Sequence, residues 1–153
     1  MEALADSFDL VIVGAWHGRG RRAGWYGALL GAAYNADEER FETVCKIGTG
    51  FTDQLLASLN AVLDPHKVER APSNVACELE PDAYFEPVVV AEVRGAELTK
   101  SPVHTAARGP QGGLALRFPR FLRWRDDKGP REATTVAEVA ALFERQRAPR
   151  KTK

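Results

Sequence analysis

TGFTDQLLASLNAVLD, residues 49–64, has the pattern of a helix in a chain whose other apolar segments mostly have the pattern of strands. Its apolar side chains recur three or four positions apart, which places them on one helical face. They are Leu55, Leu56, Leu59, Val62 and Leu63. Thr52 or Asp53 can cap the free amides at its start. A capped helix is therefore predicted here, and its place among strands decides the fold.

The segments on either side of this helix have β-branched or alternating patterns typical of strands. In 24–35 the glycines leave strand and helix in competition. A second helix is predicted over 134–146, because Thr135 and Glu138 have the spacing of a capping box. The predicted strands are residues 9–18, 24–35, 41–48, 83–98 and 113–125.

This order predicts an all-β fold with accessory helices. A helix between the third and fourth of five strands is the layout of the OB-fold, a small Greek-key barrel that often binds nucleic acid. We expect a five-stranded OB-fold barrel with a C-terminal helix. Its 153 residues suit one domain with a single core. We assign residues 1–8 to an upstream linker, 9–147 to the OB-fold domain and 148–153 to a basic tail.

The charges are balanced in number but separated along the chain. Lys and Arg number 21, as do Asp and Glu, so the net charge alone indicates no class of partner. Basic residues gather in 17–22, in 117–125 and at the C-terminal end, and acidic residues in 36–42 and 77–86. Separation of this kind predicts a surface with one positive side.

Cysteine content and hydropathy bear on the compartment. Cys45 and Cys77 have no CxxC spacing, which favours two buried thiols in a reducing compartment. No apolar run approaches the roughly 18 residues of a membrane span. We therefore expect a cytoplasmic protein that does not contact a membrane. The three histidines are scattered without metal-ligand spacing, so no metal site is predicted.

The glycine-rich stretch at 18–23 has two interpretations. Gly-Arg-Gly-Arg-Arg-Ala matches a dinucleotide-binding fingerprint if 24–35 is a helix. The acids at 37–39 argue against this, because they precede the next strand instead of ending it. As a loop between strands, the stretch presents Arg19, Arg21 and Arg22 either to phosphates or, as a solvated hairpin tip, to water.

A second glycine segment, KIGTGFTD at 46–53, leads into the helix. Gly48 and Gly50 flank Thr49 just before the free amides of a helix start, where an anion is favoured. The alternative is a glycine turn that only lets the strand enter the helix.

RFPRFLRWRDDK, residues 117–128, combines arginines with aromatic rings. Strand alternation places Leu114, Leu116, Phe118, Leu122 and Trp124 on one face, and Arg117, Arg123 and Arg125 on the other. Pro119 is expected to interrupt the ladder, which leaves the facing of Arg120 and Phe121 open. The arginine face suits either solvent or nucleic-acid phosphates.

Four stretches together resemble the C-terminal OB-fold domain of ATP-dependent DNA ligases of the archaeal and eukaryotic replicative type. The resemblance runs from Asp9 to about Gln146 in the family's order, and KIGTGF, RFPRF and R-x-D-K are its specific parts. The stretches are DLVIVGAWHGRGRRAGWYG (9–27), TVCKIGTGFTD (43–53), VVVAEVRGAELTKSPVHTAARG (88–109) and LALRFPRFLRWRDDKGPREATT (114–135).

The resemblance implies that R-x-D-K, residues 125–128, acts on ATP during enzyme adenylylation. Arg125 and Lys128 would neutralise and orient the β- and γ-phosphates, and Asp127 would help to position them. These three are the predicted catalytic residues. The role requires that neither cation is locked inside the fold by internal carboxylates.

The resemblance also implies contacts with nicked DNA. Arg117 and Phe118 would meet the minor groove, and Arg19, Arg21, Arg22 and Lys46 would hold backbone phosphates. Strand alternation places Phe118 on the core face, which conflicts with a groove contact. A bend at Pro119 would resolve the conflict.

The adenylated lysine of the family lies in a K-x-D-G motif, which this sequence lacks. We therefore expect ATP and Mg²⁺ to serve the full-length enzyme and this chain alone to be inactive and to bind neither. Expected partners are nicked double-stranded DNA and the adenylation domain of the same ligase, with a monomeric state, in DNA replication, repair and recombination. The alternative is a stand-alone OB-fold nucleic-acid-binding module without ligase activity.

Overall fold

The computed structural model describes residues 7–20 and 24–147. Arg21 and Arg22, both predicted DNA contacts, lie outside the described residues. In chain order the elements are β1 (Ser7–His17), β2 (Tyr26–Asn35), β3 (Arg40–Ile47), α1 (Asp53–Leu63), η2 (Asp64–His66), β4 (Lys67–Val68), β5 (Val75–Ala76), β6 (Ala83–Phe85), β7 (Val90–Arg94), β8 (Glu97–Ser101), β9 (Ala106–Gly109), β10 (Gly112–Arg117), β11 (Arg120–Trp124), η3 (Pro130–Glu132) and α2 (Val136–Arg147).

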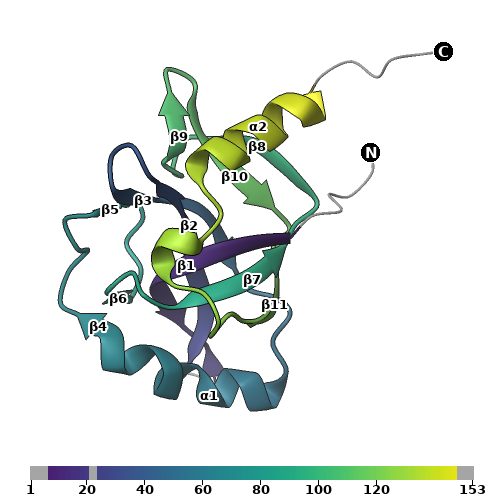
Figure 1. Cartoon of the computed structure of the whole chain (residues 1–153). Coiled ribbons are helices and arrows are strands. Elements are labelled where there is room, and N and C mark those ends of the chain that lie inside the picture. Colours follow the sequence, from purple (N-terminus) through teal and green to yellow (C-terminus); the bar gives the residue numbers. More distant parts are fainter. Residues whose placement is uncertain (1–6, 21–23, 148–153) are drawn as a thin grey trace.

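The strands form two sheets. The larger runs in the order β11-β7-β1-β2-β3-β5, with β6 pairing β1 and β4, and the smaller in the order β8-β10-β9. Figure 1 shows α1 across one end of the curled sheet and α2 at the other end, beside β8 and β9. All strand pairs among the described residues are antiparallel except β3 with β5. The all-β OB-fold class with accessory helices is confirmed.

Strand β1 is buried on both faces. Leu10 and Ile12 belong to the main core beneath the curled sheet, whereas Val11 and Val13 belong to a second apolar cluster on the opposite face. This explains the continuous apolar run in 10–13, since a strand covered on both sides needs no polar alternation.

Strand β2 resolves the competition between helix and strand in 24–35. It lies between β1 and β3, and a Cβ at Gly31 would be 3.1 Å from the Leu10 side chain and 3.3 Å from that of Ile47. The dinucleotide-fingerprint interpretation is therefore wrong, because no helix follows the glycines of 18–23.

Both helices begin where their capping residues predict. The Thr52 hydroxyl oxygen accepts from the Leu55 amide at 3.1 Å. At the start of α2, the Glu138 amide donates to Thr135 Oγ1 at 3.1 Å, and the Thr135 amide donates to Glu138 Oε1 at 2.9 Å. These are the reciprocal bonds of a capping box. Among the described residues, no helix is both long enough and apolar enough to span a bilayer.

Two of the predicted strands are each divided. Residues 83–98 contain β6, β7 and the first part of β8, and 113–125 contain most of β10 together with β11. Strands β10 and β11 lie in different sheets, and the chain passes between them through Phe118 and Pro119. Pro119 interrupts the ladder as predicted, so the number of strands exceeds five without a change of fold class.

Hydrogen bonds join the KIGTGF segment (46–51) to the RFPRF segment (117–121). The Thr49 hydroxyl donates to the Pro119 carbonyl at 2.9 Å, and the Phe121 amide donates to the Thr49 carbonyl at 2.9 Å. Gly50 has φ +95°, and a Cβ there would lie 2.3 Å from the Phe121 carbonyl oxygen. This contact favours the glycine-turn interpretation of residues 46–53, because Gly50 lets the loop pass against β11.

Helix α2 covers the outer edge of the smaller sheet through one side chain. The Leu98 amide donates to Gln146 Oε1 at 2.7 Å, and Gln146 Nε2 donates to the Leu98 carbonyl at 2.7 Å. The Gln146 amide therefore pairs with edge strand β8 as a neighbouring strand would.

A buried polar cluster joins the two sheets. The Thr43 amide donates to Thr105 Oγ1 at 2.8 Å, and His104 Nδ1 lies 3.2 Å from Thr43 Oγ1. His104 is 8% exposed, and its burial lowers its pKa to about 4. The folded protein therefore holds this imidazole neutral near pH 6.

We predict that Gly50→Ala lowers the free energy of unfolding by about 2 kcal/mol, because the new Cβ combines a left-handed φ with a backbone clash. Urea unfolding measures the change. The matched control is Gly48→Ala, where a Cβ meets nothing within 4 Å. Equal stabilities of the two variants would contradict the tight approach at Gly50.

We predict that acid destabilises the fold through His104. Because its folded pKa of about 4 lies below the ordinary value of 6.5, the unfolded chain takes up the proton first as pH falls. The free energy of unfolding should fall by about 1–2 kcal/mol between pH 6.5 and 5. Denaturant unfolding across this pH range should show a shallower dependence of the free energy of unfolding on pH in His104→Gln than in wild type. A wild-type slope in His104→Gln would contradict the assignment.

Candidate functional site

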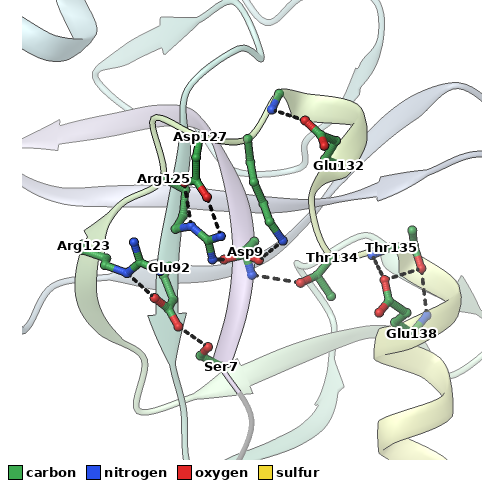
Figure 2. Close-up of polar contacts among 12 residues, drawn as sticks. Ser7, Asp9, Glu92, Arg123, Arg125, Asp127, Glu132, Thr134, Thr135 and Glu138 are labelled. Atoms are coloured by element: carbon green, nitrogen blue, oxygen red, sulfur yellow. Dashed lines mark hydrogen bonds and ion pairs between the residues drawn. The ribbon is translucent and has the colours of Figure 1, made fainter.

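The R-x-D-K motif lies in a turn directly after β11. The Arg125 amide donates to the Val90 carbonyl at 2.8 Å, and the Lys128 amide donates to the Arg125 carbonyl at 3.2 Å. The turn is thereby tied to β7, and its side chains lie over the first half of β1 (Figure 2). The structure thus brings the predicted catalytic residues Arg125, Asp127 and Lys128 together.

Two carboxylates hold the Arg125 guanidinium. Its Nε and Nη2 donate to Asp127 Oδ1 and Oδ2 at 3.0 and 2.9 Å, and its Nη1 donates to Asp9 Oδ1 at 3.0 Å. The hydrogen bonds with Asp127 raise the pKa of Arg125 and hold the pKa of the Asp127 carboxyl well below its usual range. Both groups therefore carry their charges at neutral pH.

Asp9 also holds Lys128. Lys128 Nζ donates to Asp9 Oδ2 at 2.7 Å, so each carboxylate oxygen of Asp9 accepts from a different cation. The side chains of Asp9 and Arg125 are each 15% exposed, and that of Lys128 is 31% exposed. The expectation that the cations stand clear of internal carboxylates is met only in part. Both reach the surface, yet both are paired with Asp9.

Asp9 is the site residue that sequence reasoning missed. It lies 116 positions before Arg125 in the chain and 119 before Lys128, and only the pairing of β1, β7 and β11 brings the three together. No local pattern marks it, since an aspartate at the start of a strand also suits solvent.

Arg123 is paired in the same way. Its Nε donates to Glu92 Oε1 at 2.7 Å, and the Ser7 hydroxyl donates to the other carboxylate oxygen of Glu92. The Ser7 bond and the Arg123 contact lower the pKa of Glu92. The predicted row of arginines is thus neutralised along much of its length.

A surface hollow of about 250 Å³ borders the motif. It leaves one side of Arg125 and Lys128 accessible to a small anion. Its lining consists of Val62, His66, Val88, Val89, Val90, Arg125, Asp126 and Lys128.

Arg117 and Phe118 form a separate projecting tip. Phe118 has a left-handed φ of 54° and is 68% exposed, and the Arg117 guanidinium lies 4.7 Å from the centre of its ring. Arg117 also lies 3.8 Å from Glu97. The assignment of Phe118 to the core face by alternation is therefore wrong, because the chain bends at Phe118 and Pro119.

Beyond Pro119 the predicted alternation fails at Leu122, whereas Trp124 packs against the main core and Arg123 is exposed, as predicted. Phe121 is buried and Leu122 is 37% exposed, contrary to the predicted facing of Leu122. The β11–β7 pairing has an irregularity between Phe121 and Arg123, where Leu122 is the extra residue. Such a bulge changes which side chains face the core.

Two other predicted DNA contacts lie on separate elements. Lys46 is exposed near the end of β3, with its Nζ 4.3 Å from the centre of the Trp16 ring, shortly before the loop that holds Pro119. Arg19 is exposed after β1.

The sequence of this chain is similar to the C-terminal regions of ATP-dependent DNA ligases. The model of the ATP-dependent DNA ligase C-terminal region matches residues 22–128. The DNA ligase of Sulfophobococcus zilligii is 53% identical over 146 residues, which cover 94% of this chain and 24% of that protein. The DNA ligase of Hyperthermus butylicus is 48% identical with the same coverage. The chain thus spans 24% of the length of these curated relatives.

Solved structures agree with this result. The ligase domain of LigD from M. tuberculosis superposes with a TM-score of 0.63 at 28% identity, over 84% of this chain and 38% of that one. A mycobacterial DNA ligase D complexed with ATP and MES gives a TM-score of 0.59 at 28% identity, over 85% of this chain and 38% of that one. This chain belongs to the ATP-dependent DNA ligase family and corresponds to its C-terminal region.

Proposed function

We propose that this chain is the OB-fold domain of an ATP-dependent DNA ligase that acts in DNA replication, repair and recombination. It orients the phosphates of ATP during enzyme adenylylation and grips the minor groove of nicked DNA during sealing. Its partners are the adenylation domain of the same polypeptide and nicked duplex DNA, and it works as a monomer in the cytoplasm. The matches to DNA ligases favour this over a stand-alone binding module.

The observation that carries the proposal is the tip formed by Arg117 and Phe118. A positive φ at a non-glycine residue costs roughly 1–3 kcal/mol of folding free energy. An exposed aromatic ring contributes no hydrophobic burial to offset that cost. The contacts of Thr49 with Pro119 and Phe121 hold this tip in place. A ring held outward beside a guanidinium suits the minor groove, where apolar side chains wedge between base steps and arginines contact phosphates.

The remaining basic residues extend this DNA contact. Arg19 and Lys46 are exposed, and Arg21 and Arg22 follow Arg19 closely in the sequence. Contacts of these residues with backbone phosphates supply affinity without sequence preference, which suits an enzyme that must seal nicks in any sequence.

The residues of the R-x-D-K motif fit a polyphosphate. Arg125 presents a planar fork of donors and Lys128 a compact ammonium, and both border an open hollow. When ATP is bound, its triphosphate supplies the pyrophosphate leaving group. Arg125 and Lys128 then neutralise the charge that builds up on that group, and Asp127, 63% exposed, keeps the guanidinium oriented.

Mg²⁺ belongs to the proposal for the whole enzyme. Across the part of the chain that the structure describes, no three His, Cys, Asp or Glu side chains converge as a metal site. Both carboxylate oxygens of Asp127 accept from Arg125, so this side chain can act on metal-bound phosphates only through the guanidinium that it orients.

We predict that Arg117→Ala weakens binding to nicked DNA and reduces the slope of log K against log salt by about 1, because one phosphate contact is lost. Phe118→Ala should weaken binding with little change in slope, since no charge is removed. Fluorescence anisotropy across a salt series measures both. The control is Arg147→Ala, which removes a charge from an exposed ion pair on α2. An unchanged slope in Arg117→Ala would remove Arg117 from the DNA surface.

We predict that Lys128→Ala slows adenylylation more than sealing in a polypeptide that joins this chain to the adenylation domain. The reason is that Lys128 acts on the β- and γ-phosphates, which have left as pyrophosphate before sealing begins. Single-turnover assays with ATP, and separately with pre-adenylated nicks, measure the two steps. Equal slowing of both steps would argue against phosphate orientation by Lys128.

A further inference from the structure

We infer that Asp9 is a positioning residue that stands in for phosphate between Arg125 and Lys128 until a polyphosphate displaces it. This inference rests on the proposed role of the R-x-D-K motif. It adds a residue outside the motif, on another strand, that sets how readily the motif accepts its anion.

The geometry at Asp9 is that of an anion shared by two cations. One oxygen accepts from Arg125 Nη1 at 3.0 Å and the other accepts from Lys128 Nζ at 2.7 Å. Two oxygens of one phosphate group would bind a guanidinium and an ammonium in the same way. Asp9 therefore satisfies the donors that a polyphosphate needs.

The local charge adds to this argument. Arg125 and Lys128 contribute two positive charges, and Asp9 and Asp127 contribute two negative charges, so these four side chains are neutral together. A neutral cluster offers little attraction to a triphosphate. The motif becomes a strong anion site only when Arg125 or Lys128 separates from the carboxylate that it is paired with.

Asp9 is fixed in the fold, so the cations must do the moving. Its amide donates to Thr134 Oγ1 at 2.8 Å, and its carbonyl accepts from the Thr134 amide at 2.8 Å (Figure 2). Strand pairing with Glu92 holds the same residue from the other side. Lys128 lies in a turn, and its long side chain can change rotamer. Its ammonium group can therefore move from Asp9 toward an anion in the adjoining hollow.

Removing the competing carboxylate should therefore tighten anion binding. When a binding-competent arrangement is only partly populated, the apparent affinity falls by that fraction, and a substitution that frees the competent state restores it. Asp9→Asn keeps the size of the side chain and the backbone bonds to Thr134, and it removes the negative charge.

The test is titration of the 153-residue chain with inorganic tripolyphosphate, followed by NMR at low ionic strength. Asp9→Asn should bind about tenfold more tightly than wild type. Asp9→Glu, which restores the carboxylate, should return affinity toward wild type. Glu144→Gln removes an equal charge from an exposed ion pair on α2 and should leave the affinity unchanged. Unchanged or weaker binding by Asp9→Asn, or an equal gain in Glu144→Gln, would overturn the inference.

A further variant separates this inference from the proposed function. Lys128→Gln should weaken tripolyphosphate binding, and in the Asp9→Asn background it should remove most of the gain. If Lys128→Gln weakens binding while Asp9→Asn leaves it unchanged, the inference fails and the phosphate role of the motif stands. If neither variant changes binding, the phosphate role fails, and the inference fails with it.

A wild-type measurement guards against loss of folding in Asp9→Asn. Saturating tripolyphosphate should shift the ¹³Cγ resonance of Asp9 together with the ¹³Cε resonance of Lys128, because the ion pair between them is broken. A shift at Lys128 with none at Asp9 would show that the anion binds without displacing the carboxylate, and would overturn the inference.

Discussion

The structure depends on the burial of β1 between two layers of apolar side chains. This strand pairs with β2 on one side and with β6 and β7 on the other, and the amide and carbonyl of Asp9 bond to Thr134 outside the sheet. Its side chains enter both apolar clusters. A strand enclosed in this way cannot shift its register without exposing one whole set of side chains. It is therefore a rigid base on which the surface chemistry is arranged.

Both functional regions are positioned by long-range contacts with strands. Asp9 on β1 holds the R-x-D-K turn, and Thr49, just beyond β3, holds the Phe118 tip. The domain thereby presents the R-x-D-K side chains and the Phe118 tip from one scaffold, and hydrogen bonds of neighbouring residues maintain the left-handed φ at Phe118.

Sequence patterns predicted the parts of the fold that local chemistry controls. The capping residues Thr52 and Thr135 marked both helix starts correctly, and the motifs identified the family. Local alternation failed where tertiary structure decides the outcome. The bend at Phe118 and Pro119 turned Phe118 outward, and the irregularity at Leu122 left that side chain exposed. The Asp9 contacts could not be predicted, because the partners are more than a hundred positions apart.

The hydrogen bonds between Gln146 and Leu98 bear on how the domain's exposed edge strand can pair with other chains. An uncovered edge strand offers its amides and carbonyls to any extended chain nearby, and is a common route to intermolecular association. Gln146 bonds to both the outward amide and the outward carbonyl of Leu98, near the start of β8. A single glutamine on the last helix thus occupies one of the positions through which another extended chain could pair with that edge.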